Sequence, residues 1–173
     1  MNLHKGFGEA FKALTEWIRA AERLAILAVG NPFRMDDGVG IQILKLLKAK
    51  SRRIKMVNCL QVPENHLGEV IGFKPDKVLF IDGVDAGLPP GELVFAEFTG
   101  DEKIGPIIST HGVPLDVSAS YLKASIGASV ALIGVQVSSI EFGEGLTEEV
   151  ERAAKSISHT LSKILNESFR GKL

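Results

Sequence analysis

The sequence contains a single cysteine, a single tryptophan and a single tyrosine, and it has no long hydrophobic run. One cysteine, Cys59, excludes an internal disulfide and any metal site built from several thiolates. The apolar runs have the length of strands, far below the ~20 residues of a membrane-spanning helix, so we expect no membrane insertion. The charged N-terminus lacks the apolar segment of a signal peptide, which favours a cytoplasmic protein.

An excess of charge of one sign is also missing. The formal net charge is −1, and no basic cluster interleaved with aromatic residues occurs, which argues against a nucleic-acid partner or an acidic membrane. Apolar residues make up 45% and charged residues 24% of the chain, proportions typical of a globular protein. No linker divides the chain, so we expect one α/β domain over residues 1–173, with an N-terminal extension (1–23) ahead of a core (24–173).

Strand and helix patterns alternate along the chain. Short continuous apolar runs predict buried strands, and apolar residues at helical spacing predict amphipathic helices. This alternation predicts an α/β fold, a three-layer αβα sandwich around a mostly parallel twisted sheet of about five strands. The turn-rich Asp85–Gly91 segment is too short for a crossover helix, so the strand after it should be one antiparallel edge strand. The expected strands are 24–29, 54–59, 77–82, 92–98 and 129–137, and the expected helices are 4–23, 38–50, 63–73, one beginning near Pro114, and 147–167.

Several residues have expected structural roles. The apolar stripe of the helix 4–23 should pack on the domain, although docking of a partner protein would use the same stripe. Asp36 is expected to be the N-cap of the helix 38–50, and Thr147 to cap the last helix. Cys59 should end a buried strand as an inert thiol, with a reactive thiol as the alternative.

Three polar residues lie where the fold would bring them to one edge of the sheet. Asp37 follows the first strand of the core, Asp82 ends the third, and His111 lies in the loop Ser109–Gly112. Ligands of open α/β sheets bind beyond the carboxyl ends of the strands, near a reversal in strand order. The first core strand should lie beside the third, which brings Asp37 and Asp82 together, and His111 is placed there on its chemistry alone. Two carboxylates and an imidazole suit a borderline divalent metal such as nickel, iron or zinc.

Each of these residues also has an interpretation without a functional site. Asp37 would be favourable at any helix N-terminus, Asp82 could form a turn, and His111 could be an ordinary surface residue. The conjunction of two acids at neighbouring strand ends with a loop histidine favours a site. The remaining histidines, His4, His66 and His159, are expected to be solvated.

Five stretches carry a more specific pattern: Val29–Gly40, Val62–Asn65, Ile81–Glu92, Thr110–Leu115 and Gly134–Gln136. In this order they resemble the [NiFe]-hydrogenase maturation endopeptidases, specifically the branch that processes hydrogenase 3 (formate-hydrogenlyase-type) large subunits. The resemblance covers residues 24–160, nearly the whole chain. In two places the chain departs from the family: Val137 and Ser138 stand where Pro-Glu is common, and the residues before Leu24 lie outside the shared core.

The resemblance implies a fold, a substrate and a set of site residues. The fold is a twisted sheet between helices, and the activity is that of an aspartyl peptidase-like endopeptidase. Such enzymes remove a short C-terminal extension from the hydrogenase large-subunit precursor after nickel has been inserted. Asp37, Asp82 and His111 are then the catalytic and nickel-contacting positions. Nickel is carried by the substrate as a recognition signal rather than held permanently by the enzyme.

The mechanism and two other functions stay open. No Ser–His–Asp or Cys–His arrangement is readable, so direct hydrolysis is expected, with water activated either by nickel or by a carboxylate. Asp36 and Asp85 are second choices for that carboxylate, more in keeping with a helix cap and a turn. The alternatives are a nickel-dependent module that checks the precursor without cutting it, and an unrelated αβα hydrolase of small molecules.

Overall fold

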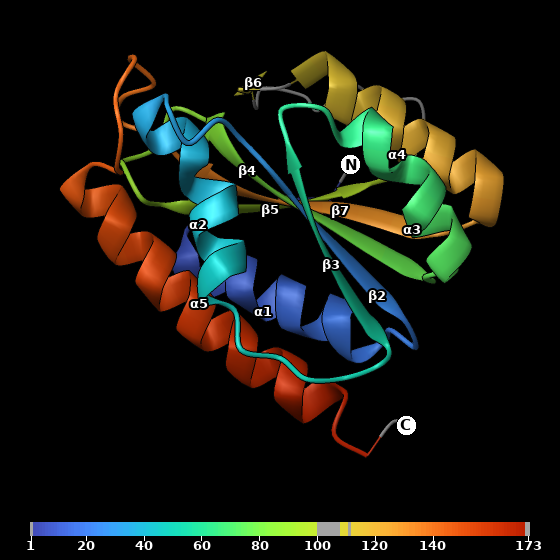
Figure 1. The fold of residues 1–173 in the computed structure, drawn as a ribbon. Helices are drawn as coiled ribbons and strands as arrows, with labels where there is room; N and C mark the ends of the chain where they lie inside the picture. The colour runs from blue at the N-terminus through green and yellow to red at the C-terminus, as the bar shows by residue number, and fades with distance from the viewer. Residues whose placement is uncertain (1, 100–107, 111, 172–173) are drawn as a thin grey trace.

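The computed structural model describes residues 2–99, 108–110 and 112–171 (Figure 1). It has the α/β fold predicted from the sequence. The strands are β1 (Asn2–Lys5), β2 (Leu24–Val29), β3 (Ile54–Leu60), β4 (Lys77–Asp85), β5 (Leu93–Phe98), β6 (Ile108–Ser109) and β7 (Ser129–Gln136). The helices are α1 (Phe7–Arg19), α2 (Val39–Leu46), α3 (Leu67–Phe73), α4 (Gly112–Ile126) and α5 (Glu148–Ser168), and the 3-10 turns η1 (Met35–Gly38) and η2 (Pro63–His66) precede α2 and α3.

The strands form one mixed sheet in the order β1-β5-β7-β4-β2-β3, and the short β6 pairs antiparallel with the end of β4. Strands β7, β4, β2 and β3 run parallel, so the first core strand lies beside the third as predicted. Strand β5 is antiparallel to β7, which confirms the direction inferred from the short turn before it. Strand β1 pairs with β5, so the edge strand is β1 rather than the 92–98 strand.

Two groups of helices cover the two faces of the sheet (Figure 1). Helices α1, α2 and α5 cover one face and bury Leu14 and Ile157 among others. Helices α3 and α4 cover the other face with Val70 and Leu122. Burial on both sides explains why β2 is apolar at every position. Within the described residues, no helix combines the length and the apolarity needed to cross a membrane.

The N-terminal segment differs from the helix predicted over 4–23. Its first residues form β1 instead, because the free side of β5 offers backbone partners for them. Gly6 then adopts a φ of 85°, a conformation that suits glycine, and turns the chain into α1. The apolar stripe of α1 packs on the domain as expected, with the Trp17 ring against the Phe95 ring at a centroid distance of 6.0 Å.

Helix α2 ends before the predicted Lys50. Leu47 already has extended backbone angles, φ −62° and ψ 132°. The backbone of Lys48 bonds to α5 rather than continuing the helix: its N–H donates to Ser162 Oγ at 2.9 Å, and its carbonyl accepts from Asn166 Nδ2 at 2.7 Å. These bonds join residues far apart in the sequence, so no local pattern indicates them.

Cys59 is the inert thiol expected from the sequence. Its side chain is 1% exposed in the core under α3. Burial, together with the negative charges of Glu69 and Glu64, raises the pKa of the Cys59 thiol to about 12. Since the thiolate is the reactive form of cysteine, this side chain takes no part in nucleophilic chemistry.

Candidate functional site

The loop between β2 and α2 carries Asp37, and two glycines allow it to fold back closely. A Cβ at Gly30, whose φ is 153°, would lie 2.1 Å from the carbonyl oxygen of Asp37. A Cβ at Gly40 would lie 2.3 Å from the carbonyl oxygen of Ile81. Only a residue without a side chain fits either place, so these glycines let η1 and the start of α2 rest on the strand ends.

Asp37 and Asp82 are both buried, with exposed fractions of 5% and 0%. Asp37 Oδ2 accepts the backbone N–H of Asn31 at 3.0 Å, inside its own loop. Asp82 Oδ1 accepts the N–H of Gly83 at 2.8 Å, and the hydroxyl of Ser109 donates to Oδ2 at 2.5 Å. Hydrogen bonds of this kind are what allows a carboxylate to remain in a protein interior.

The two acidic segments meet at the carboxyl ends of β2 and β4. These strands are neighbours, with Ala28 opposite Ile81. A Cβ at Gly83, the residue after Asp82, would lie 3.3 Å from the carbonyl oxygen of Asp36. The Asp37 loop therefore lies directly on the strand end that carries Asp82. Their catalytic and nickel-contacting roles stay predictions.

His111, the third predicted site residue, lies outside the described residues. The chain immediately before it is fixed to the end of β4, where β6 pairs. Thr110 donates its N–H to the carbonyl of Gly83 at 3.2 Å and its hydroxyl to Asp82 Oδ1 at 3.1 Å. In the described part of the chain, no three Asp, Glu, His or Cys side chains form a group that could hold a metal ion.

Asp36 has a different role from the predicted N-cap, because no side chain caps η1 or α2. Its Oδ2 accepts the N–H groups of Ser138 at 2.9 Å and Ser139 at 3.0 Å, and its Oδ1 accepts the N–H of Thr147 at 2.7 Å. Thr147 stands at the N-cap position of α5 as expected, but its hydroxyl donates to Asp36 instead of capping the helix. Asp36, fully buried, thus joins the β2–α2 loop to the β7–α5 loop.

Gln136 belongs to the Gly134–Gln136 stretch of the family resemblance and lies at the end of β7, but its local pattern gave no role for its side chain. It is 5% exposed. Its Oε1 accepts the N–H of Ala86 at 2.8 Å and of Leu88 at 3.2 Å, and its Nε2 donates to Asp85 Oδ1 at 3.3 Å. Asp85 also accepts the N–H of Gly87, which confirms its interpretation as a turn residue. Gln136 therefore fixes the turn that follows Asp82 on the chain.

The other histidines lie on β1, η2 and α5, elements that carry neither Asp37 nor Asp82. His159 is exposed, as expected. His4 and His66 are partly exposed, and each contacts a neighbouring side chain. His4 stacks on Phe95 with ring centroids 6.3 Å apart, and His66 Nδ1 lies 2.8 Å from a carboxylate oxygen of Glu69.

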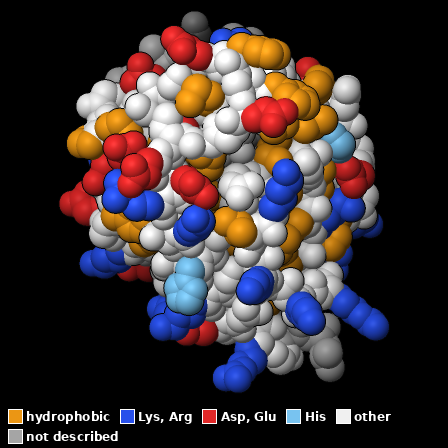
Figure 2. Space-filling view, turned by 60° about the vertical axis from the view of Figure 1, so that its left-hand side comes forward, with side chains coloured by type: hydrophobic (Ala, Val, Ile, Leu, Met, Phe, Trp, Pro, Cys, Tyr) orange, Lys and Arg blue, Asp and Glu red, His pale blue; other side chains and the backbone are white. Residues whose placement is uncertain are grey.

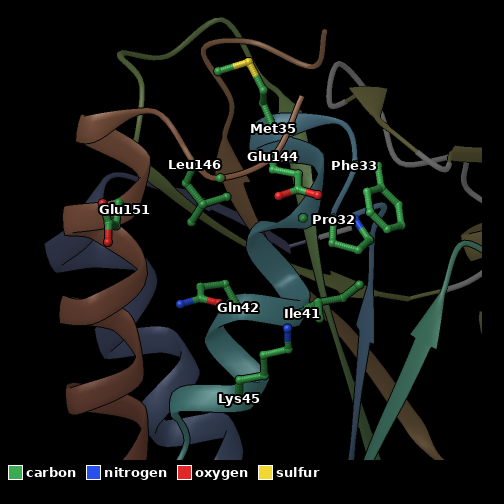
Figure 3. A pocket seen from close by; sticks show the side chains of 11 residues that line it. Pro32, Phe33, Met35, Ile41, Gln42, Lys45, Glu144, Leu146 and Glu151 are labelled. Carbon is green, nitrogen blue, oxygen red and sulfur yellow. The ribbon is translucent and has the colours of Figure 1, made fainter. Parts of the chain in front are cut away.

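A hollow of about 380 Å³ lies beside the Asp37 loop, between η1–α2 and the segment that leads into α5 (Figure 3). The side chains of Lys45 and Glu144 point into it from opposite sides. Neither Asp37 nor Asp82 lines it, so it adjoins the buried carboxylates without containing them. Its apolar lining comes from Pro32, Phe33, Met35, Ile41 and Leu146.

Sequence and structure are both similar to those of hydrogenase maturation proteases. Residues 41–165 match the family model HycI, described as hydrogenase maturation protease. The hydrogenase 3 maturation protease of Escherichia coli is 28% identical over 133 residues, which cover 76% of this chain and 84% of that relative. The crystal structure of the [NiFe] hydrogenase maturation protease HycI from Thermococcus kodakarensis has a TM-score of 0.78 at 33% identity, covering 89% of this chain and 99% of that one. The solution structure of the endopeptidase HycI from Escherichia coli has a TM-score of 0.68 at 26% identity, covering 82% and 90%.

Proposed function

Because this chain belongs to the HycI family of hydrogenase maturation proteases, and is therefore a hydrolase of peptide bonds, we propose that it removes the C-terminal extension of a [NiFe]-hydrogenase large-subunit precursor. Nickel already inserted into the precursor is the recognition signal and arrives as part of the substrate. The carboxylates of Asp37 and Asp82 and the imidazole of His111 are the groups assigned to contact it.

The observation that carries the proposal is the pair of buried carboxylates on adjoining parallel strands in a chain of this family. Asp37 and Asp82 come from separate segments that meet at the carboxyl ends of β2 and β4. This edge is where α/β sheets bind their ligands. Oxygen donors together with an imidazole form a mixed set that suits a borderline cation such as nickel.

Asp37 and Asp82 receive different roles because their surroundings differ. Asp37 keeps a 5% exposed fraction, whereas Asp82 has none. Water can reach Asp37 more directly, so Asp37 is assigned as the general base. Asp82 is fixed by bonds from Gly83, Ser109 and Thr110 and is assigned to orient the bound substrate. The nickel of the substrate supplies Lewis-acid polarisation of the scissile carbonyl.

The decisive test is the intact mass of a nickel-loaded precursor before and after incubation with this protein. We expect loss of a C-terminal peptide from the nickel-loaded precursor and no change in the nickel-free one. Equal cleavage of both would remove nickel as the signal. Binding of the loaded precursor without any change in mass would instead make the protein a checking module.

The Asp37→Asn variant tests the assigned base. Its kcat should fall by roughly 100-fold or more, while its melting temperature should stay near that of the wild type. Glu9→Gln, which changes an exposed acid on α1 outside the five family-like stretches, is the matched control and should cleave at the wild-type rate. Retained cleavage by Asp37→Asn would remove Asp37 from the mechanism.

A further inference from the structure

The carboxyl edge of the sheet exposes large apolar side chains. Phe142 is 89% exposed and Phe33 56%, and Ile140 is exposed by 38%. All three lie in the loops that follow β2 and β7, and the first of these loops also carries Asp37. Exposed apolar side chains gathered at one place on a globular protein mark a binding surface.

Hydrogen bonds join these loops into one unit, here called the paired loops (residues 31–37 and 138–147). The N–H of Gly143 donates to the carbonyl of Phe33 at 2.9 Å, and the N–H of Met35 donates back to the carbonyl of Gly143 at 3.0 Å. The buried carboxylate of Asp36, in the first loop, accepts three N–H groups of the second loop. The aromatic side chains thus stand on an ordered backbone, which lowers the entropy lost when a partner binds.

The paired loops are acidic as well as apolar. Glu141 and Glu144 are exposed, and neither forms an ion pair with another described residue. Three further glutamates follow in the first turn of α5, where Glu148 and Glu151 pair with Arg152 and Lys155 of the same helix. Arg34, the cation in these loops, donates its Nε to the carbonyl of Ile140 at 3.0 Å. In Figure 2 acidic and hydrophobic side chains predominate in the upper half of the view, and Lys and Arg side chains in the lower half.

We propose that the paired loops are the docking surface for the precursor, and that they bind an apolar segment of it flanked by Lys or Arg side chains. The inference rests on the proposed function, because the occupant is the protein whose scissile bond must reach Asp37 in the same loop. Charge complementarity selects basic residues in that segment. A symmetric dimer through this surface is disfavoured, because it would bring like acidic patches together and cover Asp37.

The hollow next to Phe33 gives this surface an anchor point. Its volume of about 380 Å³ is walled by Ile41 and Leu146, with Lys45 and Glu144 pointing in from opposite sides (Figure 3). An apolar side chain of the docked segment would be buried there, out of contact with Asp37. Buried anchors of this kind supply most of the binding free energy at protein interfaces.

The test is the dissociation constant of the complex with nickel-loaded precursor, measured by calorimetry alongside cleavage. The double variant Phe33→Ser/Phe142→Ser should raise Kd by about tenfold or more, and its KM should rise more than its kcat falls. The double variant Glu141→Gln/Glu144→Gln should raise Kd at low ionic strength. That difference should shrink as salt is added, because salt screens exposed charges.

Two matched controls change the same residue types elsewhere on the surface. Leu46→Ser alters an exposed apolar residue at the end of α2, and Glu16→Gln alters an exposed acid on α1. Both should bind the precursor with the wild-type Kd. Phe142→Ser alone replaces the phenylalanine double variant if the melting temperature of the latter falls.

The outcomes separate the docking surface from the proposed hydrolysis. A wild-type Kd in the folded phenylalanine variant overturns the docking surface, whether or not cleavage is normal. Binding that these variants weaken, with no cleavage by the wild type, supports the docking surface and overturns the proposed hydrolysis. Neither binding nor cleavage by the wild type contradicts both.

Discussion

The two edges of the parallel sheet use polar residues in opposite ways. At the amino edge, polar side chains lie at the surface and bond to nearby backbone: exposed Asp76 accepts the N–H groups of Glu22 and Arg23. At the carboxyl edge, the carboxylates of Asp36 and Asp82 are buried and bonded inward, whereas aromatic side chains face the solvent. The usual distribution of polar and apolar side chains is therefore reversed at one edge.

This reversal agrees with the docking surface proposed at the carboxyl edge. A surface that served stability alone would resemble the amino edge, where Arg53 also pairs with Glu22 at 3.0 Å. Burying two carboxylates and exposing phenylalanine both work against folding unless other interactions offset them. The hydrogen bonds to Asp36 and Asp82 offset the first, and binding of a partner would offset the second.

The largest effect on stability is expected from Asp36→Ala, which removes one of the buried carboxylates of the carboxyl edge. The variant leaves the N–H groups of Ser138, Ser139 and Thr147 without their carboxylate. These bonds are partly buried and their acceptor Asp36 is fully buried, so losing them should lower the free energy of unfolding by about 3 kcal/mol. Urea unfolding measures this change.

The control for Asp36→Ala is Glu141→Ala, an exposed acid that the same pair of loops carries. Its free energy of unfolding should stay within about 0.5 kcal/mol of the wild type. If Asp36→Ala were equally harmless, the joining of the two loops would not depend on this carboxylate.

A smaller effect, about 1 kcal/mol, is expected from Asp76→Ala at the amino edge, because its two N–H partners can turn to water. Cleavage and Kd for the precursor should be unchanged in this variant, since Asp76 lies at the opposite edge from the paired loops. Asp76→Asn keeps an acceptor oxygen and should lose less stability. A loss of cleavage in Asp76→Ala would contradict the assignment of precursor binding and cleavage to the carboxyl edge alone.

The smallest effect is expected at Glu69, an exposed residue on α3 outside the paired loops. Hydrogen bonds from His66 and then from Lys55 lower the pKa of Glu69 below its ordinary value of 4.5. A lowered pKa stabilises the fold above the unfolded-state value, and the contribution disappears as the pH falls through the folded-state value.

Glu69→Gln should therefore reduce the free energy of unfolding at pH 7 by at most ~0.5 kcal/mol, because the pair is largely exposed. The difference from the wild type should shrink as the pH falls below 4.5. Unfolding measured at a series of pH values checks this. A difference that persisted in acid would point to lost packing rather than to charge.

Much of the fold could be predicted because burial leaves a local pattern. The apolar run of β2 and the helical stripe of α5 indicate their elements to within a residue or two. The direction of β5 followed from the short turn before it. The strand β1 and the early end of α2 could not be predicted, because bonds between distant segments decide both.

The candidate site shows the same division. Asp37 and Asp82 could be singled out because one lies in the loop after a buried strand and the other in the last part of a neighbouring buried strand. Asp36 and Asp37 are adjacent and chemically identical, so no local pattern shows which carboxylate turns toward the β7–α5 loop. The structure assigns that role to Asp36, through bonds to residues about a hundred positions away.

Strand β1 replaces β5 as the edge strand of the sheet, and this bears on self-association. Without it, the apolar segment Leu93–Phe98 would present a row of unpaired backbone groups, the kind of margin onto which another chain can add a strand. Strand β1 occupies those groups and offers its own margin instead, which is four residues long and ends in Lys5. A short, charged margin discourages further pairing. By pairing with β5, the residues of β1 therefore reduce the tendency of the sheet to aggregate through this edge.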